Sequence, residues 1–95
     1  LIQSEKTPQI ERKIAPHPNI KPQSFMRKIV YAALPLGEGV VLDTFSGSGS
    51  TLAAATFWGI DSIGIEKDPE FFEMSQSTVP RLAELYPDQT KLLFY

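Results

Sequence analysis

The sequence predicts an α/β fold in which parallel strands are flanked by helices. Three observations support this prediction: short apolar runs alternate with segments of helical period, glycines separate them, and the order is helix, strand, glycine-rich turn, helix, strand, helix. Strands that alternate with helices form βαβ units, whose strands are parallel. Two strands make a poor sheet alone, so we expect these elements to be part of a larger α/β domain.

The composition is that of an ordinary globular chain. Its 95 residues include nine Lys and Arg against eleven Asp and Glu, a formal net charge of −2. The lack of Cys excludes disulfides and zinc–thiolate sites, and the single His17 excludes a multi-histidine metal site. No apolar run approaches the roughly 20 residues that span a bilayer, and no secretory leader pattern is visible. We therefore expect a cytoplasmic protein without metal or membrane partners.

The N-terminal third is first rich in proline and then helical. Residues 1–21 contain three prolines and no clear period, which predicts an extended lead-in, because proline biases its predecessor away from helix. A helix is predicted from Pro22 to about Leu34. Its apolar positions share one helical face: Phe25, Met26, Ile29, Ala32 and Ala33.

Two strands and two helices follow. The apolar run 40–42 is typical of a buried parallel strand, and residues 50–58 favour a helix that Gly59 caps. Residues 62–66 predict a second strand, and Asp68-Pro69 provides the N-cap and first residue of the last helix. That helix has an apolar face, predicted to comprise Phe71, Met74, Thr78, Leu82 and Leu85. The last nine residues, from Pro87, are predicted to form a strand or a docked tail.

A glycine-rich turn, residues 43–50, lies between the first strand and the helix after it. Gly47 and Gly49 let main-chain N–H groups approach a ligand closely, and the helix N-terminus behind them favours an anionic group. Glu66 ends the next strand, where an acid accepts hydrogen bonds from both hydroxyls of a ribose. Together these features predict a nucleoside-bearing ligand with an anionic end, although Glu66 alone is equally typical of a solvated strand end.

The residues of this turn distinguish three classes of nucleoside ligand. No Lys follows the glycines, which disfavours a phosphate-binding NTPase loop, and Leu52 stands where the dinucleotide fingerprint has Gly or Ala. S-adenosylmethionine fits better, because it offers a carboxylate and a ribose but no pyrophosphate.

Three segments resemble DNA amino-methyltransferases, which use S-adenosylmethionine to modify adenine N6 or cytosine N4. Residues 40–51 (VVLDTFSGSGST) resemble the family's cofactor loop, D-P-F-x-G-S-G-T-T. Residues 17–22 (HPNIKP) resemble its H-P-x-x-K-P segment, and residues 62–72 resemble its G-x-E-x-x-x-x-[YF] segment. The order of the segments is that of members whose catalytic half comes first, so we expect this chain to be a C-terminal, cofactor-binding portion.

The resemblance implies a partial Rossmann-like class I methyltransferase fold, with residues 1–21 as lead-in and residues 22–95 as the cofactor-binding part. It also implies roles for individual residues. Glu66 would bind the ribose, Lys67 would pack on the adenine, and Lys21 would reach the carboxylate. The cradle for the methionine part, including the serine hydroxyls, would comprise Asp43, Phe45, Ser46, Gly47, Ser48, Gly49 and Ser50.

The chain also departs from the family pattern. Thr44 replaces the usual Pro and Ser50 the first Thr of the loop. The catalytic [DNS]-P-P-[YFW] motif, which holds a flipped base, is absent, since none of the eight prolines adjoins another. No catalytic residue is therefore assigned, and we expect the chain to be inactive alone. The expected partners are DNA, through the parent enzyme, and a complementary catalytic half or further copies of this chain. A non-catalytic methylase-like interaction module and a dinucleotide-binding oxidoreductase fragment are the alternatives.

Charge is distributed unevenly along the chain. Residues 1–34 hold six Lys and Arg against two acids, a net of +4, whereas residues 35–95 carry −6. The basic N-terminal segment could place positive charge near phosphate groups. A solvent-exposed surface without a binding role has the same charge pattern.

Overall fold

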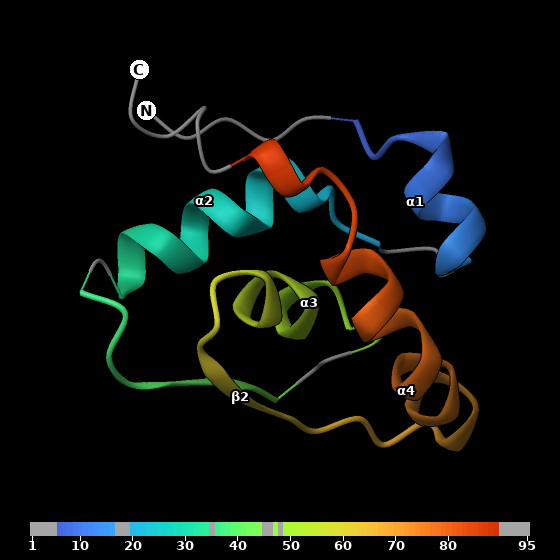
Figure 1. Ribbon diagram of the computed structural model, residues 1–95. Coiled ribbons are helices and arrows are strands. Elements are labelled where there is room, and N and C mark those ends of the chain that lie inside the picture. The colour runs from blue at the N-terminus through green and yellow to red at the C-terminus, as the bar shows by residue number, and fades with distance from the viewer. Residues whose placement is uncertain (1–5, 17–19, 35, 45–46, 48, 90–95) are drawn as a thin grey trace.

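The computed structural model describes residues 6–16, 20–34, 36–44, 47 and 49–89. Among them it has four helices and two strands (Figure 1). In chain order these are α1 (Gln9–Ile14), α2 (Gln23–Ala33), β1 (Val40–Asp43), α3 (Ser50–Phe57), β2 (Asp61–Gly64) and α4 (Pro69–Ala83). The predicted alternation of strands and helices is therefore confirmed.

The two strands form a parallel pair joined through α3. Val40 is aligned with Asp61 and Asp43 with Gly64, and the N–H of Ile65 donates to the oxygen of Asp43 at 2.8 Å beyond the last aligned pair. The second strand begins and ends earlier than predicted, at 61–64 rather than 62–66, so Glu66 lies two residues past β2. The unit β1–α3–β2 brings the carboxyl ends of both strands to one edge.

Helix α3 forms the centre of the molecule. Ala53, Ala54 and Ala55 are fully buried, because α3 packs between α2 and α4 (Figure 1) and also contacts both strands. The predicted glycine cap is confirmed: Gly59, at φ +71°, donates to the oxygen of Thr56, and Ile60 donates to that of Ala55. This pair of bonds is the Schellman arrangement that ends a helix.

Two small apolar clusters lie on either side of α3. One joins α2 and the sheet to α3 and contains Val30, Ala54, Ala55 and Ile60. The other joins α4 to the N-terminal segment and contains Ala15, Ala53 and Leu82. The small alanine side chains allow the neighbouring helices to approach α3 closely.

The predicted extended lead-in is wrong over Gln9–Ile14, which forms α1. Pro8 immediately precedes the helix, and its oxygen accepts from the N–H groups of Glu11 and Arg12 at 3.1 and 3.2 Å. Proline fits this position because a helix start requires no N–H from it.

The predicted apolar face of α2 is wrong in part, since Phe25, Met26 and Ile29 are only half-buried. The buried residues of this helix are Gln23, Arg27 and Val30, whereas Ala32 and Ala33 are exposed. Met26 does pack against the first cluster. The helix therefore turns a partly polar stripe inward.

Helix α4 begins as predicted and runs through Pro80 to Ala83. Pro69 occupies its first turn, and the carboxylate of Asp68 accepts from the N–H of Glu70 at 2.9 Å. Of the predicted face, Thr78 and Leu82 are buried. Residues 90–95, and with them most of the predicted C-terminal strand or tail, lie outside the described residues.

One face of the sheet is apolar and uncovered by the described chain. Its side chains are between 53 and 61 % exposed: Val40, Leu42, Ile63 and Ile65. Parallel sheets normally have both faces covered, so this exposure is typical of a fragment of a larger sheet. In the described ranges, no helix is long and apolar enough to cross a membrane, and no His, Asp and Glu group is arranged to hold a metal ion.

Candidate functional site

The carboxylate of Glu66 links the glycine-rich turn to the start of α4. One oxygen accepts from the N–H of Gly47 at 2.8 Å, and the other accepts from the N–H of Asp68 at 3.0 Å. Gly47 follows β1 and Glu66 follows β2. Their hydrogen bond therefore joins the two loops that leave the carboxyl ends of the strands. Each carboxylate oxygen has two acceptor positions, which leaves capacity for two further donors.

Glycine is favoured at two positions in the turn. Gly47 and Gly49 have φ values of +50° and +87°, in the left-handed region that L side chains rarely adopt. A Cβ at Gly49 would also overlap Cγ2 of Val79 on α4. The turn can therefore pass tightly between the sheet edge and α4 only with glycine at residue 49.

Helix α3 starts directly behind this turn. Its first internal hydrogen bond runs from the N–H of Ala53 to the oxygen of Gly49 at 2.8 Å. The N–H groups of a first helical turn point away from the helix's own carbonyls, and the helix dipole adds positive potential there. Gly49 is the N-cap and brings no side-chain acceptor, so this end of α3 suits an anionic group.

The segment before α2 is held against the same helix start. The main-chain N–H of Lys21 donates to Oγ of Ser50 at 3.4 Å. Nε2 of Gln23 donates to the main-chain oxygen of Ser50 at 2.9 Å. Lys21 is exposed and Ser50 is buried. The structure thus brings residues 21–23 beside the glycine-rich turn, 27 to 29 positions further along the chain.

A buried polar cluster supports this arrangement. Glu11, Gln23 and Arg27 are each at most 1 % exposed, and Oε1 of Glu11 accepts from the Gln23 N–H at 2.8 Å. Oε1 of Gln23 accepts from Nε of Arg27 at 3.3 Å. Burial lowers the pKa of Arg27 to about 10, while the charges of Glu11 and Tyr86 raise it in part. Arg27 therefore remains a cation at neutral pH.

Sequence reasoning missed this cluster. Its members lie on two helices, and α1 itself was not predicted. The one sign of this cluster in the sequence is the spacing of Gln23 and Arg27, which are four residues apart and therefore share a side of α2. Helical periodicity alone does not distinguish such a buried polar pair from a solvent-exposed face.

The structure brings together several of the predicted site residues. Gly47, Glu66 and the Gly49–Ser50 helix start meet at the sheet edge, and Asp43 ends β1 with its oxygen bonded to Ile65. Lys67 is exposed next to Glu66. Phe45, Ser46 and Ser48 lie outside the described residues, as does His17. The predicted roles of all ten site residues toward a ligand stay predictions.

Chemically, this edge offers acceptors at one end and donors at the other. The Glu66 carboxylate suits hydroxyl donors, and the α3 N-terminus suits an anion. The arrangement therefore suits a polar ligand with hydroxyl donors at one end and an anionic group at the other.

Comparison with known proteins identifies the family. A DNA methylase family profile of the N6/N4 type matches residues 2–77. Type II methyltransferase M2.MboI of Moraxella bovis is 30 % identical over 81 residues, 85 % of this chain and 29 % of that protein. Type II methyltransferase M.HinfI of Haemophilus influenzae is 33 % identical over 72 residues, 76 % of this chain and 19 % of that protein.

DNA adenine methyltransferase YhdJ of Escherichia coli K12 is 40 % identical over 58 residues, 61 % of this chain and 19 % of that protein. The chain thus spans less than a third of the length of these curated relatives. No solved structure matches significantly. The family profile covers most of the chain and contains all three segments described above, so the chain belongs to the N6/N4 DNA methylase family.

Proposed function

We propose that this chain is the S-adenosylmethionine-binding part of a DNA methyltransferase that acts on the exocyclic amine of adenine (N6) or cytosine (N4). Family membership supports methyl transfer to DNA as the reaction class. The relatives are named as type II and DNA adenine methyltransferases, which favours a restriction–modification setting. The chain spans under a third of them, so the activity is proposed for the whole protein that contains it.

The observation that carries the proposal is the contact between Gly47 and Glu66. It holds an acidic side chain and a helix N-terminus at the same edge of two adjacent parallel strands. In open α/β sheets, ligands bind outside the carboxyl ends of the strands. A molecule with a ribose at one end and a carboxylate at the other matches the acceptors and donors in this arrangement.

The residues of the chain have distinct proposed roles. Glu66 accepts from the ribose hydroxyls through its remaining acceptor positions, and the N–H groups at the start of α3 bind the carboxylate. Lys21 adds a cation beside Ser50, and the stem of Lys67 packs on the adenine. Asp43, Phe45, Ser46 and Ser48 complete the cradle.

S-adenosylmethionine, when bound, supplies an activated methyl group on a positive sulfonium. The contribution of this chain is to bind the cofactor, fix its orientation and exclude water from it. The chain has no adjacent prolines and therefore lacks the motif that would hold a flipped base. The remaining part of the protein is proposed to provide that motif and the recognition of DNA.

The test uses the full-length protein, S-adenosylmethionine with a tritiated methyl group, and unmethylated duplex DNA. We expect the label to enter DNA. After digestion of the DNA to nucleosides, it should elute as N6-methyl-2′-deoxyadenosine or N4-methyl-2′-deoxycytidine. Saturable binding of the cofactor without DNA is measured in parallel by calorimetry. Absence of cofactor binding by the folded protein would overturn the proposal.

A further inference from the structure

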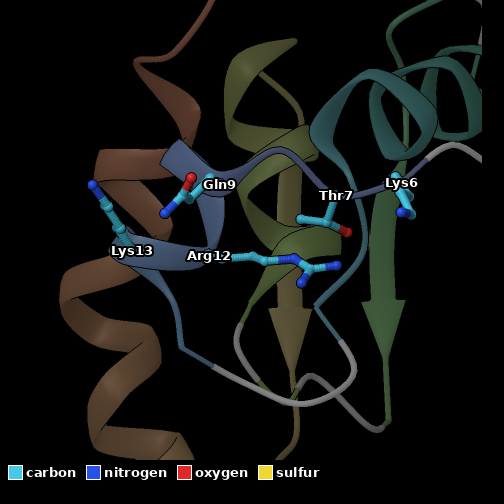
Figure 2. Close-up of a pocket in the computed structure, with 5 residues that line it drawn as sticks. All are labelled: Lys6, Thr7, Gln9, Arg12 and Lys13. Carbon is cyan, nitrogen blue, oxygen red and sulfur yellow. The ribbon is translucent and has the colours of Figure 1, made fainter.

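A basic hollow lies at α1 and the residues just before it. It has a volume of about 480 Å³ and is lined by Lys6, Thr7, Gln9, Arg12 and Lys13. Figure 2 shows these side chains. Arg12 extends from α1 toward the segment that contains Lys6 and Thr7. Three of the five lining residues are cations, and the other two are neutral and polar.

Helix α1 buries its acid and exposes its cations. Glu11, the one acid between residues 6 and 16, is 1 % exposed and accepts from the Gln23 N–H inside the molecule. Arg12 and Lys13 are exposed, and their side chains leave α1 in different directions (Figure 2). Within the described ranges no carboxylate forms an ion pair with Lys6, Arg12 or Lys13.

The hollow is fixed to the rest of the molecule. Oγ1 of Thr7 donates to the oxygen of Ile20 at 2.9 Å, and Ile20 packs against the cluster of Ala15, Ala53 and Leu82. Ile20 is followed directly by Lys21, which bonds to Ser50 at the start of α3. The basic hollow and the candidate site are therefore joined through one short, hydrogen-bonded segment.

We propose that this hollow, defined by Lys6, Thr7, Gln9, Arg12 and Lys13, binds backbone phosphates of duplex DNA. An arginine fork and two lysines suit successive phosphate oxygens, and the side-chain amide of Gln9 adds a neutral donor. The hydroxyl of Thr7 is already used in its bond to Ile20 and fixes the position of the segment. Residues 1–34 carry a net charge of +4 and residues 35–95 a net charge of −6, so the N-terminal segment is the part of the chain whose charge favours contact with a polyanion. The inference rests on the proposed function, because it takes DNA as the partner.

The test compares the full-length protein with a variant that carries Lys6→Gln, Arg12→Gln and Lys13→Gln. Affinity for a fluorescent duplex is measured between 50 and 200 mM salt, because each phosphate contact contributes about 0.9 to the slope of log K against log salt. If all three cations bind phosphates, the slope falls by roughly 2.7, and the wild-type affinity declines roughly 40-fold more than that of the variant over this range. The matched control is Arg81→Gln, which removes an exposed arginine on α4 and should leave the slope unchanged.

S-adenosylmethionine affinity, measured on the same proteins, separates the two proposals. We expect it to be equal in the wild type and the triple variant. An unchanged salt slope with intact cofactor binding would overturn the phosphate site alone. A reduced slope in a protein that binds no cofactor would support the phosphate site while contradicting the proposed function. Equal competition by millimolar inorganic phosphate and by duplex DNA, at matched ionic strength, would show a site for free phosphate and overturn the proposal.

Discussion

The Nη2 group of Arg27, in the middle of α2, donates a hydrogen bond to the main-chain oxygen of Leu82 near the end of α4, at 2.9 Å. Nη1 donates to Oε1 of Gln89 at 2.8 Å, and the guanidinium carbon lies 3.8 Å from the ring centroid of Phe57. A cation at a helix C-terminus also interacts favourably with the helix dipole. Arg27 thus joins α2, α3 and α4, although the chain places it 55 positions before Leu82.

Arg27→Ala should strongly destabilise the fold. It removes these bonds and leaves Glu11 buried without the nearby cation, a change that costs about 3–5 kcal/mol. Arg81→Ala is the matched control: it removes an exposed arginine from the last turn of α4 and should cost about 0.3–1 kcal/mol. Urea unfolding followed by circular dichroism measures both. Similar losses for the two variants would contradict the assigned role of Arg27.

Gly49→Ala should destabilise the protein more than Gly59→Ala. Both glycines have positive φ, +87° and +71°, so each alanine pays about 1–2 kcal/mol for the left-handed conformation. Only at residue 49 does the new Cβ overlap another side chain, that of Val79, which adds about 1–3 kcal/mol. Urea unfolding again measures the difference, and the double variant Gly49→Ala, Val79→Ala should recover part of it. Equal effects at the two glycines would show that the turn is not packed against α4 as described.

Tyr86 should ionise well above the ordinary range of tyrosine. Burial raises its pKa from 10.0 to about 12, and the charge of Glu11 and a hydrogen bond with it act in the same direction, against Arg27. Because the folded-state pKa is raised, its contribution to stability is complete below pH 10 and is lost as the pH rises to 12. The phenolate absorbance difference between the wild type and Tyr86→Phe should therefore appear near pH 12. A difference centred at pH 10 would contradict the described environment.

The order of elements was predictable because it follows from local signals. Glycines, Asp68-Pro69 and short apolar runs mark where strands and helices of the β1–α3–β2–α4 segment begin and end. The same signals failed for α1, which is only six residues long and whose burial depends on Glu11 meeting Gln23. They failed again for α2, where a buried arginine is stable only because α4 and Phe57 surround it. Contacts of this kind depend on tertiary partners that no local pattern contains.

The candidate site was predictable to a similar degree. A glycine turn after one strand and an acid after the next imply a shared edge, and Gly47 and Glu66 do meet there. The direct hydrogen bond between them was not predicted, because the sequence does not show how tightly the turn folds back. Glu66 thus has a structural role in holding the turn, in addition to the ribose role proposed for it.

Calorimetry on the full-length protein can separate these two roles in a double-mutant cycle. The variants are wild type, Glu66→Ala and the control Glu70→Ala, an exposed acid on α4. The ligands are S-adenosylhomocysteine and its 2′-deoxy analogue, which lacks one ribose hydroxyl. If Glu66 accepts from the ribose, Glu66→Ala should weaken the parent ligand on the order of ten-fold more than the deoxy analogue, since a hydrogen bond to a charged group contributes about 1.5–3 kcal/mol. Glu70→Ala should leave both affinities unchanged. Equal losses for the two ligands in Glu66→Ala would mean that Glu66 only holds the turn, and would contradict the account of how this edge binds its cofactor.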